Sequence, residues 1–167
     1  RITMSETFTA RVWVLGDDID TDIIIPTEYL ALKTIDDMKQ YGFSPLRPEL
    51  AAQIQPGDVI VAGKNFGCGS SREQAPEIIK ALGIRAVIAK SFARIFFRNS
   101  INNGLLLIEN GNLHDAVKEG DEIEVTMGER IVANGKEFPI ASLPQNLLDI
   151  INAGGLVKAM RKRNGLD

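Results

Sequence analysis

Three short apolar runs constrain the fold of this chain most strongly. They cover residues 59–62 (VIVA), 86–89 (AVIA) and 105–108 (LLLI). Segments with a helical pattern separate them, over residues 71–82 and 91–102, and Ser91 is expected to cap the second helix. Buried strands that are joined by helices pair in parallel through right-handed crossovers. The sequence therefore predicts an α/β protein whose core is a largely parallel βαβαβ sheet.

The flanking segments predict a smaller antiparallel β layer and further helices. Residues 9–15 alternate between polar and apolar and read as a strand, and residues 121–140 suggest short antiparallel strands. A short helix is expected over residues 34–41, with Thr34 as its cap, and two more over 143–152 and 156–163. We expect one domain over residues 1–167, with Met4 as the native start and residues 1–3 outside the natural sequence.

Composition excludes several functional classes. The chain of 167 residues has 19 Lys and Arg against 22 Asp and Glu, a net charge of -3. Nucleic-acid and anionic-membrane partners normally require a basic excess, so we expect neither. No apolar run approaches the roughly 20 residues of a membrane span, and no secretion signal opens the chain. A cytoplasmic location is therefore expected.

The chain has one cysteine, Cys68, and one histidine, His114. A disulfide within the chain is excluded, and so is a zinc or iron–sulfur site built from its own Cys and His residues. We therefore expect no metal on this chain. Cys68 is interpreted as a small, well-packed loop residue, and His114 as an ordinary surface side chain.

A glycine-rich loop, residues 63–73 (GKNFGCGSSRE), lies between a predicted strand and a predicted helix. Backbone N–H groups of such a loop, together with the helix dipole, form a site for an anion. The same field would stabilise the alkoxide of Ser70, so that this hydroxyl could act as a base. Arg72 can offer two parallel hydrogen bonds to a carboxylate.

Other interpretations of this loop remain open. Ser70 or Ser71 can simply cap the helix, with Glu73 or Gln74 completing a capping box. The dinucleotide motif GxGxxG does not fit, because Arg72 occupies the position of its third glycine, and no GxxxxGK[ST] run is present.

Three segments in the same order carry a family resemblance: residues 20–26 (DTDIIIP), 63–75 (GKNFGCGSSREQA) and 90–99 (KSFARIFFRN). Together they resemble the small subunits of the isopropylmalate isomerase family, which are free-standing counterparts of the C-terminal swivel domain of aconitase. The likeness extends from about Val12 to Leu156. Aconitase relatives usually have His where this chain has Gln74, a difference that affects helix capping more than chemistry.

The resemblance implies a swivel-type fold with three layers, β/β/α, and a hydro-lyase reaction. The family dehydrates and rehydrates a hydroxy acid, which moves a hydroxyl between adjacent carbons. The resemblance implies that Ser70 is the base, that Arg72 binds a substrate carboxylate and that Ser71 assists. The positions that match the motifs in supporting roles are Thr21, Asp22, Gly67, Gly69 and Arg94.

In the third motif, the helical pattern suggests that Phe92, Ile95 and Phe96 belong to the core. Arg94 and Asn99 are expected to support the structure rather than touch substrate.

The resemblance also implies a partner. In the family, a [4Fe-4S] cluster acts as a Lewis acid on the departing hydroxyl. One cysteine cannot supply the three or four thiolates that such a cluster takes. We therefore expect a separate large subunit to bring the cluster, in a heterodimer or heterotetramer, so that this chain forms half of an active site.

Substrate specificity is assigned to Ala31 and Leu32. Aconitase and homoaconitase carry Arg at the position of Ala31, where it pairs with a third carboxylate. An apolar wall suits a branched alkyl group and leaves a buried carboxylate unpaired. This favours isopropylmalate, and hence leucine biosynthesis, although Lys33 is close enough in sequence to alter the pocket.

Two other readings are retained. The first is a small subunit acting on dimethylmalate, citramalate or homoaconitate. The second is a non-catalytic anion-binding module, against which Ser70 and Arg72 argue.

Overall fold

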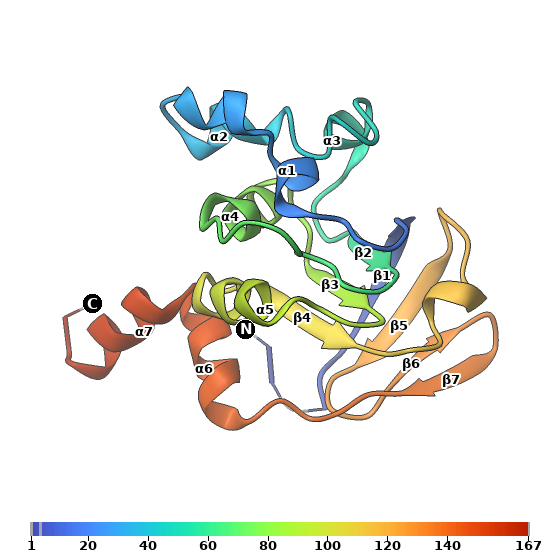
Figure 1. Ribbon diagram of the computed structural model, residues 1–167. Helices are drawn as coiled ribbons and strands as arrows, with labels where there is room; N and C mark the ends of the chain where they lie inside the picture. Colours follow the sequence, from blue (N-terminus) through green and yellow to red (C-terminus); the bar gives the residue numbers. More distant parts are fainter. Residues whose placement is uncertain (1, 4, 167) are drawn as a thin grey trace.

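A computed structural model describes residues 2–3 and 5–166, so the expected start at Met4 lies outside the described residues. Its strands form a seven-stranded sheet with the order β4-β3-β2-β1-β5-β6-β7 (Figure 1). They are β1 (Thr7–Val14), β2 (Val59–Ala62), β3 (Ala86–Ala89), β4 (Leu106–Glu109), β5 (Glu122–Thr126), β6 (Arg130–Ala133) and β7 (Lys136–Pro139).

The helices are short and lie mainly beside the parallel part of the sheet (Figure 1). They are α1 (Thr21–Ile24), η1 (Thr27–Ala31), α2 (Ile35–Lys39), α3 (Leu50–Gln53), α4 (Gln74–Ala81), α5 (Arg94–Asn102), η2 (His114–Ala116), α6 (Gln145–Ala153) and α7 (Leu156–Arg163). None of the described helices is long and apolar enough to cross a membrane.

The predicted parallel core is confirmed. Strands β2, β3 and β4 pair in parallel, with Val59 opposite Ala86 and Ala86 opposite Leu106. Strands β2 and β3 are buried along their whole length, which explains their continuous apolar runs. Strand β1 joins both parts of the sheet: Val12 pairs in parallel with Val59, while Arg11 faces Glu122 of antiparallel β5.

Two hydrophobic cores lie on opposite faces of the parallel strands. One contains Ile60 and Val87 together with residues of α1, α2, α4 and α5. The other contains Val61 and Ile88, and is covered by side chains of β5–β7 and α6. The antiparallel strands therefore form a second β layer, which confirms the expected β/β/α arrangement.

The predicted cap of α5 is wrong. Ser91 does not cap this helix; its Oγ accepts a hydrogen bond of 2.8 Å from the N–H of Asn65. Phe66 donates to the oxygen of Ser91 (3.1 Å) and accepts from the N–H of Ala93 (2.9 Å). This pairing keeps residues 91–93 extended, so that α5 begins only at Arg94.

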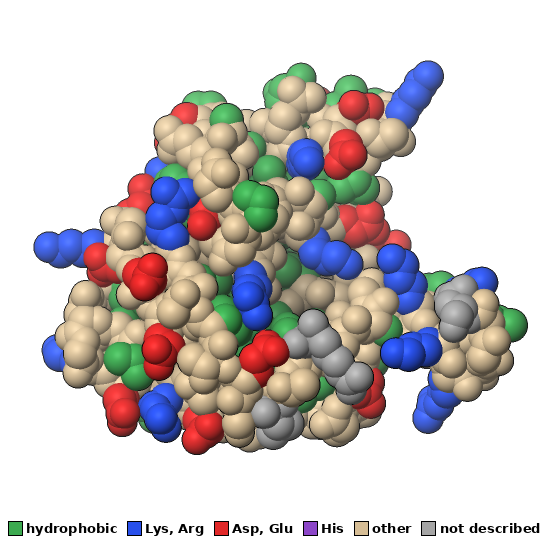
Figure 2. Space-filling view, turned by 180° about the vertical axis from the view of Figure 1, so that it is seen from behind, with side chains coloured by type: hydrophobic (Ala, Val, Ile, Leu, Met, Phe, Trp, Pro, Cys, Tyr) green, Lys and Arg blue, Asp and Glu red, His purple; other side chains and the backbone are tan. Residues whose placement is uncertain are grey.

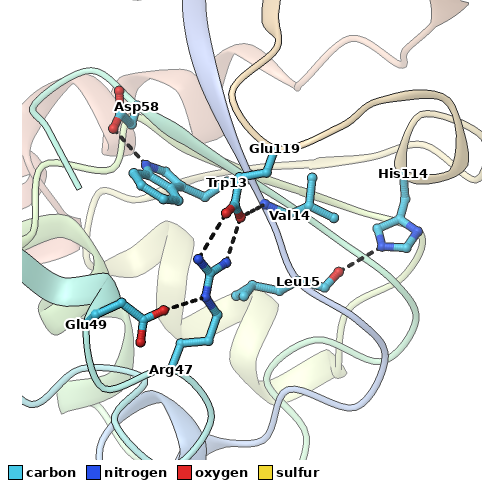
Figure 3. A network of polar contacts seen from close by, with 8 residues as sticks. All are labelled: Trp13, Val14, Leu15, Arg47, Glu49, Asp58, His114 and Glu119. Atoms are coloured by element: carbon cyan, nitrogen blue, oxygen red, sulfur yellow. Dashed lines mark hydrogen bonds and ion pairs between the residues drawn. The ribbon is translucent and has the colours of Figure 1, made fainter. Parts of the chain in front are cut away.

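A polar network attaches the irregular segment around α3 to β1 (Figure 3). Arg47 donates to both carboxylate oxygens of Glu119, at 2.6 and 2.9 Å, and to Glu49 at 3.2 Å. Glu119 also accepts from the N–H of Val14 at 3.2 Å. The bonds from Arg47 hold the pKa of Glu119 below its usual value.

The prediction that His114 is an ordinary surface side chain is wrong. Its Nε2 lies 2.8 Å from the oxygen of Leu15 (Figure 3), and its Nδ1 lies 3.0 Å from the carboxylate of Asp115. Only 21% of the side chain is exposed. It therefore joins η2 to the segment that follows β1.

A second network closes the amino end of β2. Asp58 accepts hydrogen bonds from the Trp13 indole (2.7 Å), the Gln55 N–H (2.8 Å) and Arg11 (2.9 Å). Burial alone would raise the pKa of Asp58, but these three donors lower it below its usual value.

Candidate active site

The glycine-rich loop leaves the carboxyl end of β2, the edge where α/β sheets place their ligands. Three hydrogen bonds fix it to the segment around α1. Gly67 N–H donates to Ile19 (2.7 Å), Thr21 N–H donates to Cys68 (2.9 Å), and the Thr21 hydroxyl donates to the backbone oxygen of Ser70 (2.8 Å). Because Thr21 is 2% exposed, this clamp is well protected from water.

Gly67 allows the loop to lie directly against α5. Its φ is +86°, and a Cβ atom at this position would lie 2.1 Å from the ring of Phe96. A side chain cannot be accommodated there without moving the helix. Gly69 also has a positive φ, +93°, which favours glycine.

The prediction that Ser70 or Ser71 caps α4 is wrong. The helix begins at Gln74, its N-cap is Glu73, and no side chain caps it. The clamp from Thr21 keeps the loop out of the helix through Ser70. Both serines are exposed, and neither serves as a helix cap. Their hydroxyls are therefore available for a functional role.

The loop and α5 together enclose a pocket of about 230 Å³. The loop contributes Gly67, Gly69, Ser70, Ser71 and Arg72, α1 contributes Thr21, and the second side comes from Ala93, Arg94, Ile95, Phe96 and Asn99. Asn99 also approaches the Ser71 hydroxyl, at 3.4 Å. Motifs that are far apart in sequence therefore meet at one site.

Arg72 is held in a defined position within this site. Its Nη1 donates to the oxygen of Ile25 at 3.0 Å and pairs with Asp22 at 2.5 Å, while Nη2 donates to the Thr27 hydroxyl at 2.9 Å. The Arg72 side chain is 15% exposed and that of Asp22 is 64% exposed. The guanidinium is thus fixed, and its anionic partner Asp22 is open to solvent.

Cys68 lies in the same loop but has no sign of reactivity. Burial, with Asp20 and Asp18 nearby, raises the pKa of its thiol. A raised pKa disfavours the nucleophilic thiolate. This agrees with the interpretation of Cys68 as a packing residue.

The structure does not bring Ala31 and Leu32 into the pocket. They lie at the end of η1 and directly after it, and both are exposed. Neither lines the pocket around Ser70. Their expected part in specificity remains a prediction.

Two residues of the site were missed or misplaced by sequence reasoning. Ile95, expected in the core, is 50% exposed and lines the pocket. The signal was present, because Ile95 and Arg98 are three residues apart and so share one face of α5, away from buried Phe96. Thr27 gave no signal, because only the tertiary structure brings its hydroxyl to Arg72.

The described residues are not suited to hold an iron–sulfur cluster. They contain no group of three or more His, Cys, Asp or Glu side chains arranged to hold a metal ion. The sequence offers Cys68 as its single thiol.

Comparison with known proteins decides the family. Residues 22–112 match the family described as the Aconitase C-terminal domain. The chain is also 79% identical to the 3-isopropylmalate dehydratase small subunit of Lachnospira eligens, over 98% of this chain and 100% of that protein. The chain belongs to the 3-isopropylmalate dehydratase small subunits.

Other members of this family agree in fold and length. The crystal structure of a 3-isopropylmalate dehydratase from Methanocaldococcus jannaschii superposes with a TM-score of 0.88 at 42% identity, covering 95% of this chain and 96% of that one. A relative named isopropylmalate/citramalate isomerase small subunit, from the same organism, is 43% identical over 96% of this chain and 97% of its own length. The expected swivel-type α/β fold is thus confirmed.

Proposed function

We propose that Ser70 is the base with which this 3-isopropylmalate dehydratase small subunit removes a carbon-bound proton from its substrate. The observation that supports this most is the convergence of Ser70 with Arg72 and Arg94 on one pocket. The two cations that line the pocket with Ser70 create a field that favours its alkoxide over the neutral hydroxyl.

The reaction needs one proton carrier of this kind. The Ser70 alkoxide takes the proton from carbon, the electron pair of that C–H bond forms the C=C bond, and the hydroxyl leaves the adjacent carbon. In the return step the departed hydroxide adds to the carbon that lost the proton, and Ser70 gives the proton to the carbon that lost the hydroxyl. The interconversion of 2-isopropylmalate and 3-isopropylmalate is therefore balanced without an oxidant or reductant. We assign this reaction to leucine biosynthesis, in the cytoplasm.

Arg72 is proposed to bind a substrate carboxylate. Its guanidinium is held by Ile25 and Thr27, so it meets the substrate with little loss of side-chain freedom. The exposed carboxylate of Asp22 occupies Nη1 in the unbound chain and would give way to, or share the guanidinium with, the incoming carboxylate. Ser71, whose hydroxyl Asn99 approaches at 3.4 Å, assists at the same place.

The [4Fe-4S] cluster of the family is proposed to lie in a separate large subunit, with which this chain forms a heterodimer or heterotetramer. The relatives are named small subunits, which supports a larger partner. The thiol content of this chain supports the same division, because Cys68 alone cannot hold a cluster.

A second substrate class has specific support. One relative is named for both isopropylmalate and citramalate, which differ in the size of the alkyl group. In this chain, Ile95 offers an exposed apolar side chain at the pocket that suits either group. Dimethylmalate is compatible for the same reason, and a homoaconitate-type substrate is disfavoured because Ala31 offers no cation to its additional carboxylate.

The proposal is tested by assaying the purified chain with and without its large subunit against isopropylmalate, citramalate, dimethylmalate and homoaconitate. Turnover of isopropylmalate only in the assembled enzyme is expected. If another alkylmalate has the highest kcat/KM, the substrate assignment is wrong. If the assembled protein binds these acids but converts none, it is a non-catalytic anion-binding module.

The predicted role of Ala31 and Leu32 has its own test. Ala31→Arg should shift the ratio of kcat/KM for isopropylmalate to that for homoaconitate about tenfold toward homoaconitate, which corresponds to about 1.4 kcal/mol. An unchanged ratio would show that these residues do not contact the substrate in the assembled enzyme.

A further inference from the structure

The C-terminal helix α7 has an apolar face that nothing in the described chain covers. No residue of α7 is buried. Leu156, Val157 and Met160 are 37%, 73% and 53% exposed, and Leu166 beyond the helix is 60% exposed. A helix of eight residues has little stability of its own in water, because most helices depend on packing of one face.

The same helix borders a groove of about 820 Å³ between α6 and α7. Its lining includes the apolar residues Ile150, Ala153, Leu156 and Met160 and the basic residues Lys162 and Arg163. Asp149, which also lines it, accepts a hydrogen bond from Gln145 within α6.

The charge of this region is opposite to that of the rest of the chain. Leu156–Arg163 contains Lys158, Arg161, Lys162 and Arg163 and no acidic residue, whereas the whole chain has a net charge of -3. In Figure 2, Lys and Arg side chains gather at the right-hand end, where α7 lies. A surface that combines exposed apolar and basic side chains suits a partner surface that is both apolar and acidic.

Helix α5 connects this face with the Ser70 pocket. Arg94 and Ile95 at its start line the pocket, and Arg98 is exposed one turn further on. At its end, the backbone of Gly155 lies so close to Asn102 that a Cβ atom there would be 2.7 Å from the Asn102 oxygen. Nine residues of α helix span about 14 Å, so a protein that covers the pocket needs to extend only that far to reach α7.

We propose that the apolar and basic face of α7 is an anchoring surface for the large subunit, and that it meets an acidic patch of that subunit outside the active site. This rests on the proposed function, because it assigns a surface to the partner inferred there. A symmetric pair of copies of this chain is the less favourable occupant, since it would place Lys162 and Arg163 of one α7 against those of the other.

The test measures the affinity of purified large subunit for the full-length chain by sedimentation or interferometry. Val157→Glu and Met160→Glu should each raise the Kd of the complex about tenfold or more. Each places an unpaired negative charge in the interface, and this charge also repels an acidic partner. The matched control is Leu46→Glu, which makes the same change at a side chain that is 44% exposed and belongs to the irregular segment before α3.

Charge reversal provides an independent arm. The double variant Lys162→Glu, Arg163→Glu should slow association and reduce its dependence on ionic strength, whereas Lys136→Glu on β7 should not. All substituted side chains belong to exposed residues, and an unchanged melting temperature of each isolated variant verifies that the fold is intact.

The outcomes separate the two proposals. If the wild-type chain forms no complex with the large subunit, the proposed function fails. If the complex forms and the α7 variants bind as tightly as Leu46→Glu, the anchoring surface is wrong while the proposed function stands. If the variants instead abolish self-association of the isolated chain and leave the affinity for the large subunit unchanged, α7 is an interface between copies and the inference is overturned.

Discussion

Polar groups lie beside both ends of strand β2, but the two sets are used differently. At the amino end, Asp58 is 6% exposed and accepts from Trp13, Gln55 and Arg11. At the carboxyl end, Ser70 and Ser71 are exposed and line a pocket. The first end is a closed network, and the second is open to a ligand.

The difference indicates where stability and chemistry reside. A buried polar group that has all its partners within the chain contributes to folding and is costly to disturb. Polar groups that converge on an open pocket, and that the fold does not need, are available to bind and react. Changes at the carboxyl end should therefore affect activity alone, and changes at the amino end should affect stability alone.

The largest effect is expected at the carboxyl end. Ser70→Ala should reduce the turnover of the assembled enzyme by about 10²–10⁴-fold or more, because it removes a base. Its free energy of unfolding should equal that of the wild type, since Thr21 bonds the backbone oxygen of Ser70 rather than its hydroxyl. Ser71→Ala serves as the matched control and should have a smaller effect on turnover.

Asp58→Asn should show the reverse pattern. We expect it to lower the free energy of unfolding at neutral pH by about 1–3 kcal/mol, the usual range for a hydrogen-bonded charged group. The kcat/KM of the folded, assembled variant should stay at the wild-type value. A variant that loses activity while keeping its stability would break the distinction between the two ends.

The effect of Asp58 should also depend on pH with a definite sign. Folding lowers the pKa of this carboxyl, so its contribution is present above the pKa of the unfolded chain and is lost as the pH falls through the lower, folded value. Denaturant unfolding should therefore show the wild type and Asp58→Asn converging in stability as the pH falls below about 4. A gap that persists under strongly acidic conditions would mean that the charge of Asp58 is not responsible.

Arg72→Lys should raise KM about tenfold with a smaller change in kcat. Lysine keeps the charge but cannot offer two parallel hydrogen bonds to a carboxylate. Steady-state kinetics of the assembled enzyme measures this split. A fall in kcat with unchanged KM would place Arg72 at the reacting atoms instead of at the carboxylate.

The smallest effect is expected for Thr27, which acts through Arg72. Thr27→Val removes the hydroxyl that accepts a hydrogen bond from Nη2 of Arg72. KM should rise a few-fold, the change that corresponds to the free energy of about one hydrogen bond. Thr27→Ser keeps the hydroxyl and should restore the wild-type KM. Equal KM values for the Val and Ser variants would show that the hydroxyl does not position Arg72.

Much of the fold could be predicted because its signals are local. The apolar runs that became β2 and β3 are buried on both faces, and their alternation with helices specifies parallel pairing. Thr34 caps α2 as predicted, by accepting from the N–H of Asp37 at 3.0 Å. The loop between β2 and α4 could be located for the same reason.

The errors arise where tertiary contacts override local preference. Serine is a good helix cap, yet the clamp from Thr21 keeps Ser70 out of the helix, and pairing with Asn65 occupies Ser91. His114 lacks any local signal, because its partner Leu15 is 99 residues away. The residues of the site could be predicted from the sequence motifs, whereas the hydrogen bond between Arg72 and Thr27 could not.

The central claim, that Ser70 is the base, is tested most directly by the single-turnover rate of dehydration. The assembled enzyme, in excess over 3-isopropylmalate and at a concentration well above the Kd for this substrate, should form the unsaturated acid rapidly. Ser70→Ala should slow this step about a hundredfold or more while binding substrate and large subunit with wild-type affinity. Dehydration by Ser70→Ala at the wild-type rate would contradict the claim and leave the loop as a binding site only.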